Sequence, residues 1–515
     1  MSKTQGSHTR KRIVIVGAGP GGLSAAMILA ARGFEVDVYE KQAKIGGRSA
    51  EVVLGDYRFD LGPTFLMMKY LLDELFEEAG RKSSDYLDCR RLDPMYRLVF
   101  GDKQMLVTDD RARMKAEIDR VFPGEGDSLD RFHARESKRF EHLYPCLQRD
   151  YGKLHRFFST TLLAAFPHIA AGRSLYDVLS DYFKSEELRL AFTFQSKYLG
   201  MSPWECPGLF AMIPYTEHAH GIYHVMGGLS KISDALRKVA EEHGARVHTS
   251  SPVKRVLLEG RRTAGVELSD GQIVRADAVF VNADFGHAMQ HLFPEEKLKH
   301  YKPSELRKKN YSCSTYMLYL GLDRSYPDCE HHMIVFAKDY KKNLEDISIE
   351  KKCSEDVSVY VRNAAPLDPG CAPEGHSALY ILCPVPNNTS GVDWDTEKHV
   401  YRERILDILE TRSPYKDIRK HIQRELVVTP KDWEEKHSVF LGATFNMGHN
   451  ISQMLYMRPH NAFEEFDDCY LVGGGTHPGS GLPTIFESAR ISANLFCDKI
   501  GVPYAPPKPF TEPLT

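Results

Sequence analysis

The chain has 515 residues, enough for two or three domains of ordinary size, and its 42% hydrophobic and 27% charged residues are typical of a soluble globular protein. A formal net charge of −3 gives no electrostatic reason to expect a nucleic-acid partner. The ten cysteines include no C-x-x-C pair, so we expect no metal site and no dithiol redox motif, and reduced thiols fit a cytoplasmic protein.

The chain opens with the pattern of one βαβ unit. We predict a strand at Ile13–Val16, a helix at Gly21–Arg32 and a second strand at Val36–Tyr39. Residues 13–31 carry no charge and follow three basic residues, which resembles a signal anchor. Four glycines and a proline in that run are poor in a transmembrane helix, so a glycine-rich nucleotide turn explains it better.

Later elements alternate between two kinds of pattern. From about residue 81 to residue 221 the spacing of apolar residues predicts helices, with Asp127–Tyr144 and Leu175–Phe194 as examples. The amphipathic helix Ser230–His243 follows, and after it strands recur. The predicted strands are 247–249, 253–258, 263–268, 272–275, 278–281, 316–322, 379–383 and 470–473, and further helices are predicted at 399–411 and 483–497.

Nucleotide-domain patterns therefore occur at the start, in the middle and at the end of the chain. The simplest architecture is an α/β fold whose Rossmann-type domain is assembled from three chain segments, with an inserted mixed α+β substrate domain. We assign residues 11–80, 221–290 and 431–501 to the first domain and residues 81–220 and 291–430 to the second. Residues 502–515 are proline-rich and are expected to form an extended tail.

The first strand of the βαβ unit leads into a glycine-rich turn. Gly17 permits a tight turn, Gly19 lets the backbone approach a pyrophosphate, and Gly22 lets the helix pack close to the sheet. The helix N-terminus then offers free N–H groups and a positive dipole end to the phosphates. Glu40 follows at the end of the second strand, where a carboxylate accepts hydrogen bonds from ribose hydroxyls. This context predicts a dinucleotide site.

The next motif favours FAD over NAD. In Gly46-Gly47-Arg48, the glycines let the chain pass close to the cofactor and the arginine is suited to pair with its pyrophosphate. A surface ion pair is the plain structural alternative for Arg48. The glutamate followed by this motif resembles FAD proteins of the amine oxidase type. No second G-x-G-x-x-G is present to bind NAD(P)H.

A second glycine-rich turn lies near the C-terminus, at residues 470–483. Pro483 stands where a helix begins, at its preferred first position. A helix N-terminus near the flavin N1–C2=O edge stabilises the reduced, anionic flavin, and Gly475 brings the turn close to it. His477 in the same turn is either an acid or base in the reaction or a residue of geometric use only.

The C-terminal run, Tyr-Leu-Val-Gly-Gly-Gly-Thr-His-Pro-Gly-Ser-Gly-Leu-Pro, resembles the signature of bacterial carotenoid desaturases, the phytoene and dehydrosqualene desaturases. The resemblance covers about residues 11–501. Gly474 and residues 484–487 depart from the usual pattern near the flavin, which leaves the exact reaction open. Further matches in the family's order are residues 191–196, 221–229, 270–271, 276–279, 282–284 and 488–490.

The resemblance implies one non-covalently bound FAD and a hydrophobic polyene substrate. Hydride leaves an activated carbon for flavin N5 and a proton leaves its neighbour. The resemblance also implies that Pro63 and Thr64 lie near the isoalloxazine edge, although from chemistry alone they form only a turn. We count Val253, at the start of a predicted strand, among the cofactor contacts as well.

Other functions remain open on the same sequence. A carotenoid isomerase or a terminal oxidase of the superfamily shares the fold but changes the chemistry. An amine oxidase is a more distant alternative, and a non-catalytic, FAD-stabilised lipid carrier is an alternative from another class. Among these functions, the sequence favours a carotenoid desaturase.

A polyene of this kind resides in a bilayer, so we expect contact with a membrane surface on the cytoplasmic side. Residues 157–171 are apolar, uncharged and too short to span a bilayer, and Arg156 and Arg173 flank them. This segment is either a peripheral membrane contact or a buried helix of the substrate domain. Oxygen or a quinone is expected to accept the electrons.

Overall fold

The computed structural model describes residues 11–508. Its first core is a five-stranded parallel sheet in the order β19-β13-β1-β2-β9. The strands come from three distant parts of the chain, which confirms a nucleotide-binding domain assembled from three segments. They are β1 (Arg12–Val16), β2 (Glu35–Tyr39), β9 (Arg246–His248), β13 (Ala278–Val281) and β19 (Cys469–Leu471).

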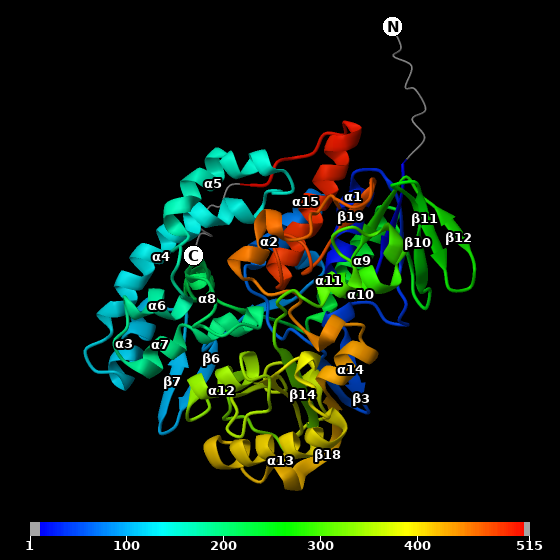
Figure 1. Ribbon diagram of the computed structural model, residues 1–515. Coiled ribbons are helices and arrows are strands. Elements are labelled where there is room, and N and C mark those ends of the chain that lie inside the picture. Colours follow the sequence, from blue (N-terminus) through cyan, green and yellow to red (C-terminus); the bar gives the residue numbers. More distant parts are fainter. Residues whose placement is uncertain (1–10, 509–515) are drawn as a thin grey trace.

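Alternate residues of this sheet pack on two different layers. Ile13 and Ile15 of β1 face a layer of helices, whereas Val14 and Val16 face the other side. On the helical side α1 packs against α9 and α15, and α15 packs against α2 (Figure 1). These helices are α1 (Pro20–Ala31), α2 (Lys69–Glu78), α9 (Ser230–Glu242) and α15 (Leu482–Ile500).

A small antiparallel sheet covers the other face of the parallel sheet. Val256, Val266 and Val274 of the small sheet share one buried cluster with β1 and β13. The predicted strands in this region are confirmed within one residue at either end. The elements are β10 (Val253–Glu259), β11 (Arg262–Leu268) and β12 (Ile273–Arg275), followed by α10 (Phe285–His291) and α11 (Pro303–Leu306).

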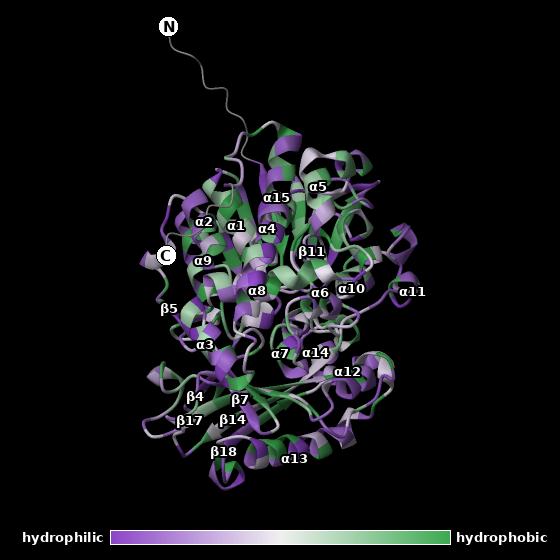
Figure 2. Ribbon diagram, turned by 90° about the vertical axis from the view of Figure 1, so that its left-hand side faces the viewer, coloured by the Kyte–Doolittle hydropathy of each residue, from purple (hydrophilic) through white to green (hydrophobic). Residues whose placement is uncertain are grey.

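The second core is a seven-stranded mixed sheet in the order β18-β14-β17-β16-β15-β6-β7. Tyr316 and Leu318 of β14 face the long helix α13, whereas Met317 and Tyr319 face the opposite side, where the β3–β4 hairpin packs. In Figure 2, α13 alternates between hydrophobic and hydrophilic colours, as a helix covering a sheet with one face does. The strands are β6 (Tyr96–Phe100), β7 (Lys103–Val107), β14 (Ser314–Leu322), β15 (His332–Val335), β16 (Val359–Asn363), β17 (Ser377–Val385) and β18 (Ile422–Val428).

Smaller elements frame the second sheet. The hairpin of β3 and β4 lies against β18 and β17, and α13 lies below the sheet in Figure 1. A further strand pair, β5 with β8, joins the start of the helical region to its end. The elements are β3 (Glu51–Leu54), β4 (Tyr57–Asp60), β5 (Cys89–Arg91), β8 (Tyr223–Val225), α12 (Tyr340–Ser348), α13 (Trp394–Arg412) and α14 (Pro430–Glu435).

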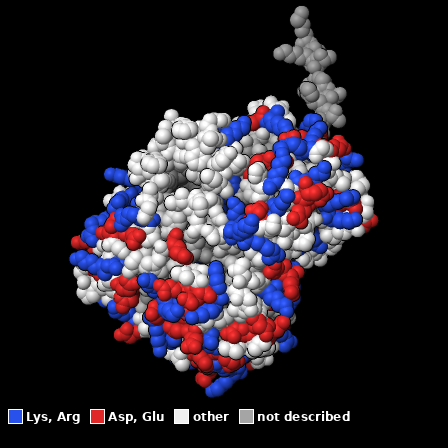
Figure 3. Space-filling view, in the orientation of Figure 1, with Lys and Arg blue, Asp and Glu red and all other residues white. Residues whose placement is uncertain are grey.

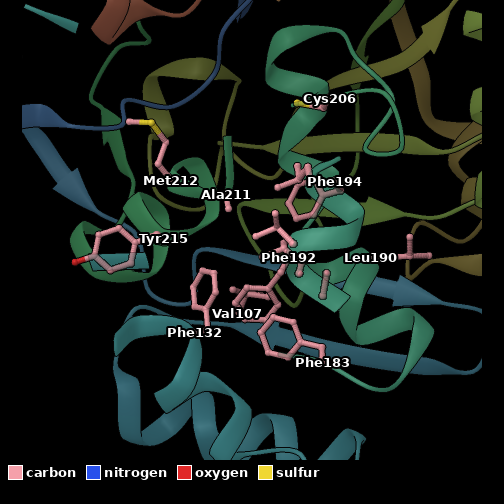
Figure 4. Close-up of a cluster of buried hydrophobic side chains, with 14 of the residues drawn as sticks. Val107, Phe132, Phe183, Leu190, Phe192, Phe194, Cys206, Ala211, Met212 and Tyr215 are labelled. Carbon is pink, nitrogen blue, oxygen red and sulfur yellow. The ribbon is translucent and has the colours of Figure 1, made fainter. Parts of the chain in front are cut away.

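Helices between residues 111 and 220 form a third layer over one buried apolar cluster (Figure 4). Phe132 of α4 packs against Phe183, Phe192 and Tyr215, which come from the following segments. The helices are α3 (Arg111–Val121), α4 (Asp127–Leu147), α5 (Thr160–Ala165), α6 (Leu175–Ser180), α7 (Glu186–Ala191) and α8 (Met212–His220).

Two sequence predictions in this region need correction. Residues 89–107 were expected to be helical, but they form β5, β6 and β7, because β6 pairs with a strand more than two hundred residues away. The segment Leu175–Phe194 is not one helix but two, because a turn at residues 181–185 separates α6 from α7. Residues 502–508 form neither helix nor strand, and the remainder of the predicted tail lies outside the described residues.

Candidate functional site

A cavity of about 550 Å³ lies between the parallel sheet and the seven-stranded sheet. Gly17, Gly19 and Glu40 line one end of it, next to the carboxyl ends of β1 and β2. In open α/β sheets, ligands bind at this edge. Apolar side chains of the second sheet, such as Met317 and Leu382, line the other end. One space therefore connects the predicted nucleotide turn with an apolar compartment.

The turn between β1 and α1 holds its backbone open toward the cavity. Gly17 has a φ of +98°, a left-handed conformation that favours glycine. A Cβ at Gly22 would lie 2.1 Å from the carbonyl oxygen of Gly17, so only glycine fits there. Gly19 is the N-cap of α1 and offers no side-chain cap, so the first N–H groups of the helix remain available. This cradle fits a pyrophosphate.

Glu40 stands at the end of β2 and is 7% exposed. Its Oε2 accepts a hydrogen bond from the backbone N–H of Ala18 at 2.8 Å, and its Oε1 accepts one from the N–H of Gln42 at 2.9 Å. The carboxylate is thus fixed at the cavity wall beside the glycine turn. Val253, the first residue of β10, lines the same end.

Arg48 also lines the cavity, but its guanidinium already has protein partners. It donates to Asp284 Oδ2 at 2.8 Å, to the carbonyl oxygen of Thr444 at 2.6 Å and to Asn446 Oδ1 at 3.1 Å. A Cβ on Gly47 would meet Gly19 Cα at 3.4 Å, so this loop lies directly on the glycine turn. Arg48 therefore ties the loop to two segments far away in the sequence.

The sequence did not single out Asp284 and Asn446 as site residues. Asp284 caps α10 by accepting from the N–H of His287, and Asn446 donates to Ser480 Oγ at 3.4 Å. Burial raises the pKa of Asp284, and the nearby charge of Arg48 opposes that rise. Asn282-Ala283-Asp284 was part of the family resemblance. The sequence signal that could have identified Asp284 as a site residue was an acidic residue close to the end of a predicted strand.

The loop that carries Pro63 and Thr64 is held by tyrosines of the second sheet. Tyr319 donates to the carbonyl oxygen of Leu61 at 2.6 Å, and Tyr380 donates to that of Gly62 at 2.6 Å. The Thr64 hydroxyl is 2.5 Å from the Tyr360 hydroxyl. Pro63 and Thr64 both line the cavity. The loop that is predicted to lie at the flavin edge is therefore held by three tyrosines of the seven-stranded sheet.

The C-terminal turn lines the same cavity. Gly475 and Pro483 line the cavity. The sequence predicted that the last helix begins at Pro483; α15 begins one residue earlier, at Leu482, and Pro483 lies in its first turn. Arg458, which is fully buried, donates to the carbonyl oxygen of Gly474 at 2.7 Å and to that of Thr476 at 3.1 Å. Burial lowers the pKa of Arg458 to about 10, a value at which the guanidinium stays charged at neutral pH. No motif in the sequence had indicated that Arg458 supports this turn.

His477 does not line the cavity. The residue is 5% exposed, and its ring contacts the ring of Tyr151 edge to face at 5.2 Å. Its carbonyl oxygen accepts a hydrogen bond from Asn461 at 3.0 Å. Burial lowers the pKa of His477 to about 4, so the imidazole is neutral at ordinary pH. This placement favours the geometric interpretation of His477 over an acid or base role.

Residues 20–495 match the family described as flavin containing amine oxidoreductase. The chain belongs to this family. A 4,4'-diapophytoene desaturase (4,4'-diapolycopene-forming) of Methylomonas sp is 52% identical over 489 residues, which are 95% of this chain and 96% of that protein. A zeta-carotene-forming phytoene desaturase of Myxococcus xanthus is 38% identical, over 95% of this chain and 94% of that protein. Within the family the chain groups with the carotenoid desaturases.

Solved structures agree with the fold. An oxidoreductase from Methanosarcina mazei superposes with a TM-score of 0.62 at 17% identity, covering 93% of this chain and 99% of that one. Cyclohexylamine oxidase from Brevibacterium oxydans gives 0.59 at 17% identity, covering 96% and 100%. The predicted fold class, the FAD cofactor and the assignment as an FAD-dependent oxidoreductase are confirmed.

Proposed function

We propose that this enzyme desaturates an acyclic polyene of the 4,4'-diapophytoene type, with FAD in the described cavity. The proposal is supported above all by the continuity of that cavity, which runs from the glycine turn to the apolar side chains of the second sheet. The relative at 52% identity is named for this substrate, whereas the relative at 38% identity is named for phytoene.

Each predicted cofactor residue has a role in this proposal. Gly17, Gly19 and Gly22 open the turn to the pyrophosphate, and Glu40 accepts hydrogen bonds from the ribose. Arg48 and Gly47 hold the neighbouring loop on that turn. The remaining contacts are Val253 at the nucleotide end and Pro63, Thr64, Gly475 and Pro483 around the flavin ring. When bound, FAD supplies the acceptor for the hydride.

The apolar end positions the substrate and excludes water. Ile334 of the second sheet, Phe336 just after β15 and Phe194 of the helical layer line it. Among the lining residues of the described chain, acidic side chains are confined to Glu40 and Asp284, at the nucleotide end. An amine substrate would find no carboxylate at the apolar end, so the geometry favours a hydrocarbon over an amine.

The reaction needs positioning more than a strong acid or base, because the developing cation beside a conjugated segment is delocalised. An isomerase or a terminal oxidase remains the alternative within this fold. Expression in a host that makes either 4,4'-diapophytoene or phytoene distinguishes them. We expect coloured products that have lost hydrogen; colourless product of unchanged mass would indicate an isomerase, and added oxygen would indicate an oxidase.

We also propose that the enzyme binds a membrane surface, on its cytoplasmic side, through a patch formed by Leu154, Phe158, Leu163, Phe166, Ile451 and Met457, here called the α5 patch. Phe158 is 76% exposed and Phe166 is 66% exposed. Phe157 contacts Tyr456 at 6.1 Å, which joins the two segments of the patch. Figure 3 shows few charged side chains over α5. An exposed apolar patch of this kind is typical of a membrane contact.

The structure adds two details to the segment at residues 157–171. Arg156 and Arg173, expected beside the membrane segment, form ion pairs with Asp150 and Asp181. Leu162, within that segment, is partly buried against the helical core, so it is not one of the exposed residues of the α5 patch. None of the helices in residues 11–508 combines the length and apolar composition that a bilayer crossing requires.

The domain bounds and the electron acceptor belong to the same proposal. We assign residues 11–80, 221–290 and 431–501 to the FAD-binding domain and the segments between them to the substrate domain. The β3–β4 hairpin, at residues 51–60, packs on the second sheet and bridges the two. Oxygen or a quinone, the second of which is soluble in a bilayer, accepts the electrons.

A further inference from the structure

A chain of hydrogen bonds leads away from the cavity beside the loop that carries Thr64. The Thr64 hydroxyl lies 2.5 Å from the Tyr360 hydroxyl, which lies 2.7 Å from His332 Nδ1. His332 Nε2 lies 3.0 Å from His331 Nδ1. Thr64, Tyr360 and His332 line the cavity, whereas His331 does not. Four side chains therefore form one continuous path from the cavity wall into the protein.

The far end of this path lies at His331. His331 precedes β15 and is partly exposed, whereas His332 is buried. His331 Nε2 has no hydrogen-bond partner among the residues that the structure describes. A buried polar atom without a protein partner is ordinarily satisfied by water. His331 Nε2, a buried atom, is therefore the last atom of the path.

Every link of the path works in both directions. In one state Thr64 donates to Tyr360, Tyr360 donates to His332 Nδ1, and His332 Nε2–H donates to His331 Nδ1. In the other state each of these bonds is reversed, so that His331 Nδ1–H donates to His332 Nε2 and Tyr360 donates to Thr64. Neutral imidazole carries one proton on either nitrogen, and a hydroxyl both donates and accepts. Moving one proton along the path converts the first state into the second.

The surroundings keep both imidazoles neutral. Arg362 lies beside them and pairs with Asp60 at 3.0 Å, so its charge is retained. His224 contacts the ring of His331 at 4.7 Å and bonds to Asp368 at 3.0 Å. Burial, together with these neighbouring groups, holds the pKa of His331 and His332 well below the usual range. Neutral rings are the form that relays a proton by exchanging tautomers.

We propose that Tyr360, His332 and His331 form the path by which the substrate proton leaves the cavity during desaturation. This inference rests on the proposed function. With the hydride transferred to the FAD, the C–H bond on the neighbouring carbon breaks and its electron pair forms the new double bond. The proton goes to Tyr360 Oη as Tyr360 gives its own proton to His332 Nδ1. His332 passes its Nε2 proton to His331 Nδ1, and the Nε2 proton of His331 goes to water.

The path also accounts for the other half of a turnover. Reduction of oxygen or a quinone takes up two electrons and two protons, of which the transferred hydride supplies only one proton. An inward passage along the same path supplies the second and restores the first hydrogen-bond state. Over one full cycle one proton moves out along the path and one moves in. The hydrogen bonds of the path thereby return to their first state without a further step.

Glu217 is the rival proton acceptor near the cavity. Its carboxylate accepts from Tyr198 at 2.8 Å, from Gln195 at 2.8 Å and from Tyr96 at 3.2 Å, and Tyr198 lines the cavity. Burial raises the pKa of Glu217 to about 7. The residue is fully buried, and no described hydrogen bond leads from it to the surface. It is an enclosed acceptor rather than a path.

The test compares Tyr360→Phe and His331→Ala with Tyr316→Phe. Tyr316 is a buried tyrosine of the same sheet that faces away from the cavity and donates to the carbonyl oxygen of Lys398, so its variant controls for the loss of one buried hydroxyl. The readouts are the single-turnover rate of product formation, its solvent deuterium isotope effect and the FAD content. The ¹⁵N shifts of labelled histidines give a readout that is independent of activity.

We expect Tyr360→Phe and His331→Ala to retain FAD and to slow product formation roughly 100-fold, the range for lost acid–base assistance. Added imidazole should rescue His331→Ala but not Tyr360→Phe. In the wild type, both histidines should give neutral ¹⁵N shifts near neutral pH. Tyr316→Phe should retain the wild-type rate.

Three results would overturn the path. They are wild-type rates in both variants, no rescue by imidazole, or a loss confined to Glu217→Gln. If the wild-type protein itself forms no desaturated product, the proposed function is wrong. That outcome differs from a failure of the path, which is seen only when the variants are compared with an active wild type.

Discussion

Glu40 Oε2 accepts a hydrogen bond of 2.8 Å from the backbone N–H of Ala18, so one carboxylate joins the end of β2 to the glycine turn after β1. We expect Glu40→Ala to weaken FAD binding by roughly 1.5–3 kcal/mol, the range for hydrogen bonds to a charged group. Titration of the apoprotein with FAD measures the change.

Glu35 provides the matched control, because it lies at the partly exposed start of the same strand and pairs with Arg246. Glu35→Ala should leave the dissociation constant for FAD unchanged. An equal loss in both variants would mean that Glu40 acts on strand stability and not on the ribose.

The glycine turn predicts a second effect. Gly19→Val should abolish FAD binding, because the added side chain occupies the space of the pyrophosphate. Gly22→Ala should do the same through the backbone, because its Cβ would lie 2.1 Å from the carbonyl oxygen of Gly17. Gly370→Ala is the control, since its Cβ meets only Asp368 Oδ1 at 3.5 Å. The FAD released from each purified variant is the measurement, and a wild-type content in Gly19→Val would refute the pyrophosphate site.

Membrane binding should depend on the α5 patch. Fully inserted apolar side chains contribute about 1.5–3 kcal/mol each, so Phe158→Asp with Phe166→Asp should greatly reduce co-sedimentation with liposomes. The FAD content should stay normal. Ile349→Asp is the control, because Ile349 is 62% exposed but lies after α12, away from the patch. Unchanged liposome binding of the double variant would place the membrane contact elsewhere.

Buried histidines predict lower stability in acid. In the unfolded chain a histidine binds a proton below about pH 6.5, whereas these remain neutral in the folded protein until about pH 3–4. The unfolded state binds more protons than the folded state in that pH range. Each histidine therefore makes the free energy of unfolding increase with pH, by up to about 1.4 kcal/mol per pH unit. The histidines are His133, His218, His220, His287 and His477.

Two buried carboxyls act in the opposite direction. Burial raises the pKa of Glu217 and of Glu487 to about 7, so the folded state binds their protons below that pH. The histidines outnumber them, and the free energy of unfolding in urea should therefore be lower at pH 5 than at pH 7. His218→Phe should make the dependence on pH shallower. Equal or greater stability at pH 5 would contradict these protonation states.

Short-range signals were sufficient for the nucleotide side of the molecule. The residues from Gly17 to Glu40 follow one another within a single βαβ unit, so spacing alone predicted the turn, the helix and the acid. The β-branched run Ile13–Val16 predicted a buried parallel strand, and the structure places Ile13 and Ile15 on one face of β1. FAD as cofactor and the desaturase family followed from motifs of this local kind.

Long-range pairing was not predictable in the same way. The strand β6 pairs with β15, and Arg48 bonds to Asp284 and Asn446, partners separated by hundreds of residues. No local pattern encodes such contacts. In the sequence, His331 and His332 are two adjacent histidines at the start of an apolar strand. Only the fold brings them into line with Tyr360.

The central claim is that a colourless acyclic polyene reduces the bound FAD directly, without NAD(P)H. The most direct test mixes the FAD-loaded protein with 4,4'-diapophytoene in liposomes without oxygen. We predict that the visible flavin absorbance falls, with on the order of one flavin used per double bond formed, while the product gains conjugation and loses a pair of hydrogen atoms. Oxygen or a quinone should then restore the absorbance. Flavin that stays oxidised, or a product of unchanged mass formed only by pre-reduced protein, would contradict desaturation.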